Sequence, residues 1–346
     1  MKALVLHGRN DLRYESGFPD PSPTAGEVLL RMTYSSICQT DIEIWKRGGI
    51  GGGEWSQPRI QGHEAAGIVA GLGKGVTTLK VGDRVAVENV RTCGLCFFCR
   101  RGQSQLCEHG RNFGFTDHGG LAELAVWPAS LCIKLPDSIS NEEAPLAEPT
   151  SVAVHAVTNS GVQVGDTAAV IGCGVVGLVT LQVLQAAGAR VVAIDPRPDS
   201  RALATRLGAM AALDPVKDEP SKLLPDLTNG FGPDVVIETA GATGTALNAA
   251  QWVRRGGKAV IVGFAAEPQE LSFSRAFMGE KVVMGSSGTG IGGYQKAVNL
   301  IASGKVVVKP LISAVVPLER GIPDGFERML RPTKDVFRIL VGNGGR

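Results

Sequence analysis

Four cysteines are grouped closely enough to constrain how this part of the chain can fold. They follow the pattern C-x-x-C-x-x-C-x7-C and are Cys93, Cys96, Cys99 and Cys107. Gly94 and Gly102 lie within the run and give the backbone freedom to turn. Four thiolates at this spacing can surround one metal ion tetrahedrally. The pattern therefore predicts a metal-bound lobe over about residues 91–110.

Zinc is the expected ion, and a single iron in the same sulfur cage is the alternative. A third interpretation is a set of buried or disulfide-bonded cysteines. The close spacing would strain pairwise disulfides, and the N-terminal residues lack the apolar segment of a secretory signal, which disfavours this interpretation. A site closed by four thiolates leaves no coordination position open, so it would hold a loop in place and chemistry must occur elsewhere.

Length and charge narrow the function classes. A chain of 346 residues is long enough for two domains. Its net charge of +2 offers no basic face for nucleic acid or an anionic membrane, so neither is an expected partner. The seven cysteines, four of them clustered, favour a reducing compartment, and we expect a cytoplasmic protein. Residues 168–189 are uncharged and long enough to span a bilayer, but Gly172, Gly174 and Gly177 and the two glutamines fit a buried strand, turn and helix better.

The sequence predicts two domains that differ in their pattern of secondary structure. Residues 1–150 carry short β-type runs separated by glycine turns, at 3–6, 27–34, 66–70 and 84–87, which predicts an antiparallel, barrel-like domain. Apolar strands alternate with helices over residues 151–288, which indicates parallel βαβ units. The tail, 289–346, begins with an amphipathic helix at 294–303 and is assigned to the first domain.

A glycine fingerprint marks a nucleotide site in the second domain. Gly172, Gly174 and Gly177 follow a predicted strand, and Val175 and Val176 open the next helix. The first glycine allows a tight turn, the second lets the backbone approach a pyrophosphate, and the third allows close packing of helix on strand. The helix N-terminus would face the phosphates. Glycines that serve packing alone are the alternative.

An acidic residue near the end of the next strand bears on which dinucleotide binds. Asp195 would accept hydrogen bonds from the adenosine ribose, and its charge would repel a 2′-phosphate. This favours NAD over NADP. Arg197 and Arg201 lie close by in sequence and leave NADP as the alternative.

A second metal set is scattered along the chain. Cys38, His63, Glu64 and Glu148 would provide one thiolate, one imidazole and two carboxylates. A mixed set of this kind leaves room for water or a substrate oxygen, which suits a Lewis acid that lowers the pKa of an alcohol. Each residue alone is a weak signal, and a lone histidine beside a glutamate is more often structural.

Taken together, these motifs resemble the zinc-dependent medium-chain alcohol dehydrogenases, and most of all their polyol branch, the sorbitol and threonine dehydrogenases. The resemblance runs nearly end to end. It is carried by Gly-His-Glu at 62–64, Val-Gly-Asp-Arg-Val at 81–85, the cysteine lobe, Glu-Pro-Thr-Ser-Val at 148–152 and the glycine fingerprint. It implies a GroES-like β-barrel catalytic domain and a Rossmann coenzyme domain in an α/β protein.

The resemblance also implies roles for individual residues. Cys38, His63 and Glu64 would be ligands of a catalytic zinc, and Glu148 would bind it directly or through a water. With the zinc in the cysteine lobe, this makes two zinc ions per chain. Thr40 would begin a proton relay from the bound alcohol, and Arg338 would reach the cofactor phosphates.

Two departures from the branch concern the substrate pocket. Its members often have histidine where this chain has Glu43, and sorbitol dehydrogenases often have an aromatic residue where it has Ile44. A carboxylate can still relay a proton, with a different pH profile. Candidate pocket residues, with simple packing as the alternative, are Trp45, Trp55, Phe115 and His118.

The expected reaction interconverts a secondary alcohol, such as a polyol, diol, sugar or amino alcohol, and its ketone by hydride transfer to NAD. Three alternatives stay open: physiological reduction of a carbonyl, a zinc-independent reductase of the same superfamily, and a non-enzymatic scaffold that binds zinc and nucleotide. By analogy with the family, pairing of the strand at 282–285 across a two-fold axis predicts a homodimer or homotetramer.

Overall fold

The computed structural model describes residues 1–49, 58–265, 268, 271, 273–331, 336–342 and 344. It forms two compact units. Unit 1 comprises Met1–Glu148, Tyr294–Ala302 and Val308–Arg346, and unit 2 comprises Pro149–Gly293 and Ser303–Val307. The sequence predicted domains at 1–150 with 289–346 and at 151–288. A search of the described helices finds none with both the length and the apolar character that a membrane crossing requires.

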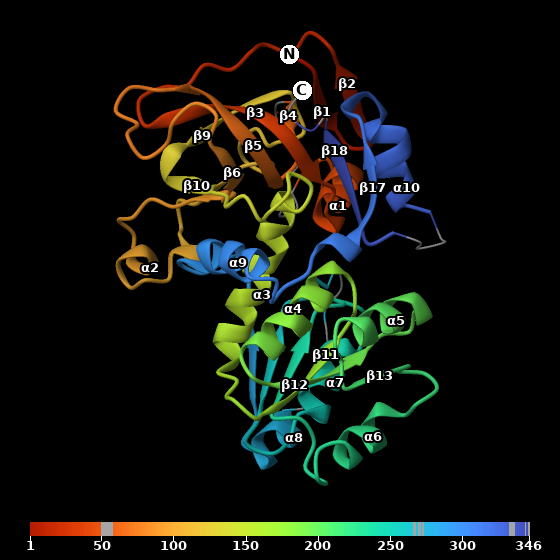
Figure 1. Cartoon of the computed structure of the whole chain (residues 1–346). Helices are drawn as coiled ribbons and strands as arrows, with labels where there is room; N and C mark the ends of the chain where they lie inside the picture. The colour runs from red at the N-terminus through yellow and green to blue at the C-terminus, as the bar shows by residue number, and fades with distance from the viewer. Residues whose placement is uncertain are drawn as a thin grey trace. The chain divides into compact units, whose positions relative to one another are not determined.

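Unit 1 is built on β-strands (Figure 1). A seven-stranded sheet has the order β10-β6-β5-β3-β18-β17, and β9 also pairs with β3. The bounds are β3 Glu27–Ser36, β5 Glu64–Leu72, β6 Arg84–Val87, β9 Leu124–Pro128, β10 Cys132–Lys134, β17 Ile312–Val316 and β18 Arg338–Gly342. A three-stranded sheet contains β1 Ala3–Gly8, β2 Asp11–Glu15 and β4 Arg59–Ile60. The short β7 Val90–Arg91 and β8 Arg111–Asn112 pair at the base of the cysteine lobe.

The C-terminal tail returns to this unit through β18, which pairs antiparallel with β3. Its neighbour β17 runs parallel to β18. Within residues 1–150 the paired strands are antiparallel, as the sequence predicts. The helical elements of unit 1 are α1 Gln39–Arg47, α2 Phe97–Arg100, α10 Glu327–Met329 and nearly all of α9 Gly293–Ala302. The sequence reasoning did not anticipate α1.

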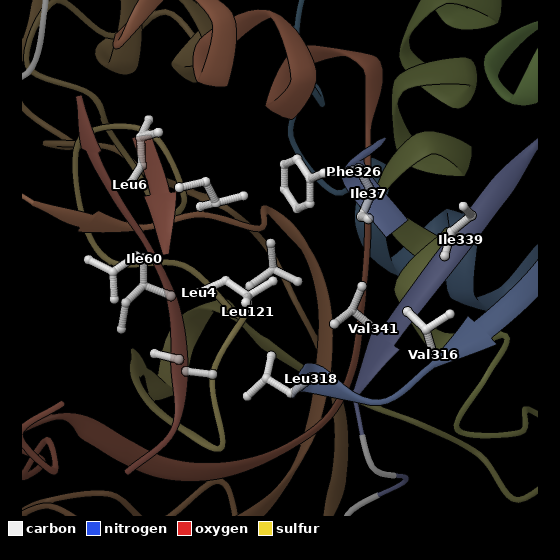
Figure 2. Close-up of a cluster of buried hydrophobic side chains, with 14 of the residues drawn as sticks. Leu4, Leu6, Ile37, Ile60, Leu121, Val316, Leu318, Phe326, Ile339 and Val341 are labelled. Atoms are coloured by element: carbon white, nitrogen blue, oxygen red, sulfur yellow. The ribbon is translucent and has the colours of Figure 1, made fainter. Parts of the chain in front are cut away.

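A buried hydrophobic cluster fixes the point where β3 ends. Figure 2 shows Ile37 close to Phe326, with Ile339 and Val341 of β18 projecting into the same cluster. Ile37, Phe326 and Ile339 have no exposed surface. Burial of each large apolar side chain contributes about 1.5–3 kcal/mol. Because Ile37 directly precedes Cys38, this packing also holds the cysteine in place.

Unit 2 contains a six-stranded parallel sheet of order β13-β12-β11-β14-β15-β16. Numbered along the chain, this is the order 3-2-1-4-5-6 of a dinucleotide-binding fold. The strands are β11 Thr167–Ile171, β12 Arg190–Ile194, β13 Ala211–Leu213, β14 Val235–Glu238, β15 Lys258–Ile261 and β16 Val282–Gly285. The helices are α3 Ala147–Ser160, α4 Val175–Ala186, α5 Pro198–Arg206, α6 Pro220–Asp226, α7 Thr245–Trp252 and α8 Phe273–Met278.

The central strands of this sheet are buried on both faces. All five residues of β11 and all four of β14 are buried. Helix α4 packs on β11 and β12, and α7 packs on β14 and β15 (Figure 1). Such strands appear in the sequence as continuous apolar runs, which is why parallel βαβ units could be predicted for this part of the chain.

Candidate active site and cofactor site

Cys38 lies between the end of β3 and the first turn of α1, as the N-cap residue of that helix. Its backbone N–H donates to Oδ2 of Asp41 at 2.8 Å. Asp41 is the third residue of the helix, so its carboxylate closes a capping box and also carries charge favourable to the helix N-terminus. Gly48, with φ of 76°, ends α1. The helix thus begins at the candidate ligand.

The pairing of β3 with β5 brings the second candidate ligand to the first. Ser36 lies opposite Glu64 in the antiparallel register, so Cys38 and His63 leave their two strands at the same end. The preceding Gly62 has φ of 97°, a left-handed conformation that side chains rarely tolerate. A slip of one residue in this register would turn His63 to the other face of the sheet.

His63 is buried and held by a carboxylate. Its Nδ1 lies 3.2 Å from Oδ1 of Asp41, and the ring of Phe115 packs against it at 4.6 Å between centroids. Because a carboxylate only accepts, Nδ1 carries a proton in this contact, and a metal bound to the ring would take the place of the proton on Nε2. Burial by itself lowers the pKa of His63, and the neighbouring Asp41 and Cys38 outweigh it, raising that pKa well above its ordinary value.

Glu64 is engaged on both oxygens. Its Oε1 receives a hydrogen bond from Nη2 of Arg338 at 2.5 Å, and its Oε2 receives one from the Ser36 hydroxyl. Arg338 is only 4% exposed, and Nη2 also lies 3.8 Å from Sγ of Cys38. The expectation that Arg338 reaches the cofactor phosphates is therefore corrected. A buried carboxylate is costly without a partner, and this guanidinium neutralises Glu64.

Cys38, His63 and Glu64 each place a ligand atom within 4.8 Å of the others. Glu148 lies outside this group, but its charge interacts with His63 and Glu64. Burial raises the pKa of the Glu148 carboxyl to about 7. The carboxyl groups of Asp41, Glu64 and Glu148 are all buried here, and the half-buried thiol of Cys38 lies nearby. The cationic partners around them are Arg338 and His63. This excess of acidic groups and the mix of sulfur, nitrogen and oxygen donors fit a divalent cation such as zinc.

Thr40 and Glu43, the two residues predicted to relay protons, lie at different distances from Cys38. The Thr40 hydroxyl is 3.7 Å from Sγ of Cys38, within reach of anything bound there. Glu43 is a turn further along α1, with a side chain 38% exposed. Its carboxylate accepts from Nε2 of Gln39 at 3.2 Å and pairs with Arg47 at 3.6 Å. Its part in a proton relay stays a prediction.

The candidate pocket residues are mostly engaged in packing. Ile44 is buried in the core, and Trp45 packs edge-on against Phe326 with ring centroids 5.7 Å apart. Nδ1 of His118 accepts a backbone N–H at 3.2 Å, and burial lowers the pKa of this histidine. Trp55 lies outside the described residues. Phe115, which covers His63, is the one of these candidates that contacts the metal group.

The cysteine lobe brings its four sulfurs together. Sγ of Cys93 lies 4.0 Å from that of Cys99, Sγ of Cys96 lies 3.9 Å from that of Cys107, and all four atoms fall within 4.8 Å of one another. The backbone N–H groups of Leu95 and Cys96 donate to Sγ of Cys93 at 3.4 and 3.3 Å. Such N–H donors stabilise thiolate charge.

The thiols of the lobe do not share one electrostatic environment. Backbone N–H groups at Cys99 and Glu108 lower the pKa of the Cys96 thiol to about 6. Burial raises the pKa of the Cys99 thiol to about 12, as it does for Cys132 in the core. Cys96 is therefore a thiol of the lobe that readily offers a thiolate to a metal ion. The donor set of the lobe therefore fits a structural zinc ion.

The glycine fingerprint lies in unit 2 between β11 and α4. Gly172 has φ of 88°, and a Cβ on Gly177 would lie 1.8 Å from the carbonyl oxygen of Gly172. Nothing lies within 4 Å of the Cβ position of Gly174, the N-cap of α4, which leaves open space at the helix N-terminus. Val175 and Val176 form the first turn. This is the arrangement that a pyrophosphate needs.

Asp195 directly follows β12, on the same edge of the sheet. Its Oδ2 accepts from the backbone N–H of Cys173 at 2.7 Å, and its Oδ1 accepts from that of Arg197 at 2.8 Å. Each carboxylate oxygen keeps a second acceptor position for a ribose hydroxyl. Arg201 is turned to Asp214 at 3.2 Å, and Nη2 of Arg197 donates to Ser200 at 2.5 Å.

Sequence reasoning missed Asp41, which holds both the start of α1 and the imidazole of His63. The signal available was an acidic residue three positions after a possible N-cap, the spacing of a capping box. It was overlooked because the N-cap residue is a cysteine, which is not a usual capping residue.

Two family models match this chain, one in each part. Residues 24–137 match the family model for the alcohol dehydrogenase GroES-like domain, and residues 175–303 match that for zinc-binding dehydrogenase. The chain belongs to the zinc-dependent medium-chain dehydrogenases. The family assignment confirms the predicted fold class, a GroES-like barrel with a Rossmann domain.

Individual relatives of this dehydrogenase are similar over nearly its whole length. D-xylulose reductase A of Aspergillus oryzae is 36% identical over 92% of this chain and 90% of its own. The crystal structure of 2R,3R-butanediol dehydrogenase from Bacillus subtilis superposes with a TM-score of 0.88, at 30% identity and 99% coverage of both chains. A putative zinc-binding dehydrogenase from Sinorhizobium meliloti 1021, bound to NADP, gives a TM-score of 0.91 at 28% identity and 98% coverage of both.

Proposed function

We propose that this dehydrogenase oxidises a secondary hydroxyl of a polyol or vicinal diol to a ketone, with NAD as hydride acceptor. The observation that carries the proposal is the buried group of Cys38, His63 and Glu64, whose ligand atoms lie within 4.8 Å of one another. The names of the relatives support the substrate class, since one is a D-xylulose reductase and another a butanediol dehydrogenase.

Cys38, His63 and Glu64 would hold the catalytic zinc, with Glu148 completing the set from the start of α3. Zinc in such a site acts as a Lewis acid that lowers the pKa of a bound hydroxyl. Asp41 holds Nδ1 of the imidazole, so Nε2 would be the ring atom that binds the ion. Cys93 and its three partners in the lobe would hold a second, structural zinc.

Two side chains near the ligands would transfer the substrate proton and exclude water. Thr40 would accept the proton of the substrate hydroxyl and pass it outward, and the 3.7 Å between its hydroxyl and Sγ of Cys38 supports this role. Phe115 covers one face of His63 and excludes water from that side.

NAD is favoured over NADP by the charge at the ribose site. The carboxylate of Asp195 would accept hydrogen bonds from both ribose hydroxyls and would repel a 2′-phosphate. Arg201 already forms an ion pair with Asp214, so it offers less to a phosphate than its sequence position suggests. Because the relative from S. meliloti is bound to NADP, NADP is the alternative cofactor, and the activity assay below includes it.

The reductive direction is the second candidate, favoured by the relative named for the reduction of D-xylulose. The same residues serve both directions, because a catalyst lowers the barrier equally for both. Equilibrium and the cellular ratio of NADH to NAD then decide the net flow.

We also propose a cytoplasmic homo-oligomer. Strand β16 is an edge of the parallel sheet, and Val282 at its start is 47% exposed. An exposed edge strand carries unpaired backbone groups that can pair with a second copy. Sedimentation equilibrium would show a dimer or tetramer, and a monomer at micromolar concentration would contradict the proposal.

The deciding experiment measures NADH formation by near-ultraviolet absorbance with sugar alcohols, vicinal diols, amino alcohols and simple secondary alcohols, and repeats it with NADP. We expect turnover with a polyol or diol, lost with a chelator and restored by zinc. Turnover that survives complete removal of zinc would contradict the proposal. Ketone reduction by NADH, tested in parallel, gives the reverse rates.

A further inference from the structure

A cavity of about 610 Å³ lies in unit 2 at the edge of the sheet where the strands begin. Thr167 opens β11, Arg190 opens β12 and Asp234 immediately precedes β14, and all three line the cavity. Gly172 and Asp195 follow the ends of β11 and β12, at the opposite edge. The cavity is therefore separate from the site assigned to the dinucleotide.

The lining carries an excess of positive charge. Arg190, Arg254 and Arg255 face it, against the single carboxylate of Asp234. Arg254 forms an ion pair with Asp234 at 2.6 Å, which neutralises that carboxylate. Nη2 of Arg190 donates to the hydroxyl of Thr167 at 2.9 Å, and Nη2 of Arg255 donates to a backbone carbonyl at 3.1 Å. These neutral partners orient the two guanidinium groups without cancelling their charge.

One wall is a loop that is rigid and exposes an aromatic ring. The Thr228 hydroxyl donates to the carbonyl of Leu224 and accepts the N–H of Gly232 at 2.8 Å. The N–H groups of Gly230 and Phe231 are also bonded within the loop. These backbone groups are therefore not offered to a ligand, and the donors that line the cavity are the arginine guanidinium groups and the side-chain amide of Asn229. Phe231 itself is 75% exposed and lines the cavity.

We propose that this cavity binds a mononucleotide. Arg190 and Arg255 would bind its phosphate, because guanidinium groups form paired, charge-assisted hydrogen bonds with phosphate oxygens. The base would stack on Phe231, since a planar ring buries aromatic surface at a low entropic cost. The volume lies in the range of small-ligand sites. An inorganic anion would use the arginines alone and leave the ring exposed.

The test is calorimetric titration of the zinc-loaded protein with adenylate, adenosine and inorganic phosphate. Saturating NADH is present, so that adenylate cannot enter the dinucleotide site. We expect one adenylate per chain, with adenosine and phosphate each at least about 10-fold weaker because each lacks one of the two contacts. The double variant Arg190→Gln/Arg255→Gln should weaken adenylate binding by about 10-fold or more. Lys222→Gln, an exposed charge change on α6, should leave it unchanged.

Phe231→Leu separates the aromatic contribution, because it keeps an apolar side chain and removes the ring. It should weaken adenylate several-fold and leave phosphate binding unchanged. It also decides the matter if the double arginine variant fails to fold, since Phe231 is largely exposed. Absence of adenylate binding, binding indifferent to these variants, or phosphate binding as tightly as adenylate would each overturn the proposal.

Discussion

The cysteine lobe and the buried group around Cys38 both place thiols at candidate zinc sites, but they are built differently. The lobe draws four sulfurs from residues 93–107, and none of these cysteines is fully buried. The other group joins Cys38, which is half-buried as well, to the buried His63 and Glu64 more than twenty positions away. Local spacing is enough to form the first site, whereas the second requires the sheet.

The difference has a functional consequence. The lobe offers four thiols, and a zinc ion held by all four would have no open coordination position, so this site would only stabilise the fold. The group around Cys38 offers a thiol, an imidazole and a carboxylate, of which His63 is held by Asp41 and Glu64 by Arg338. A metal bound by such a mixed set could keep a position open for an oxygen of the substrate. We therefore expect the first site to govern stability and the second to govern turnover.

Loss of Cys38 should separate the two sites most sharply. In Cys38→Ser, turnover should fall by more than the ~100-fold that removal of an outer-shell partner typically causes. NAD binding, measured by fluorescence titration, should be retained because the glycine loop lies in unit 2. Cys132→Ser, a buried cysteine outside both groups, should keep most of its activity. Equal loss of NAD binding and turnover in Cys38→Ser would argue against separate sites.

Loss of a lobe cysteine should have the opposite signature. Cys96→Ser should release one zinc per chain and lower the free energy of unfolding by about 4 kcal/mol or more, because loss of a metal is among the largest single-residue effects. Denaturant unfolding and metal analysis measure both. Turnover per folded molecule should stay near that of the parent chain. A Cys96→Ser protein of parental stability would refute the structural role.

Removal of the carboxylate that holds His63 should give an intermediate effect. In Asp41→Asn, activity or zinc affinity should fall by about 10–100-fold, because the imidazole loses the partner that fixes its tautomer. Steady-state rates at defined free zinc measure this change. Asp137→Asn, at an exposed position, provides the control. If both variants behaved alike, the contact between Asp41 and His63 would be incidental.

Replacement of Glu43, the predicted relay residue nearest to solvent, should change turnover least among these variants. Glu43→Gln should lower turnover by roughly 3-fold and shift its pH profile, as expected for one member of an exposed proton relay. The comparison is with Glu142→Gln, whose side chain is exposed elsewhere in unit 1. An unchanged pH profile for Glu43→Gln would remove this residue from the relay.

Much of the molecule was predictable because its signals are local. The strands of unit 2 are continuous apolar runs, the fingerprint of Gly172, Gly174 and Gly177 is contiguous, and the spacing of the four lobe cysteines specifies their cluster. These features depend on backbone sterics and on short loops that need no distant partner. The sequence by itself therefore determined the fold class, the nucleotide loop and the lobe.

Tertiary structure decided what depends on pairing between distant segments. The register that sets Ser36 opposite Glu64 brings Cys38 to His63, and no local pattern specifies that register. The turn of Arg338 toward Glu64 rather than toward phosphate follows from burial, because a desolvated carboxylate must find a cation. The partner of a charged side chain depends on which groups lie near it in space, and these groups come together only when the chain folds.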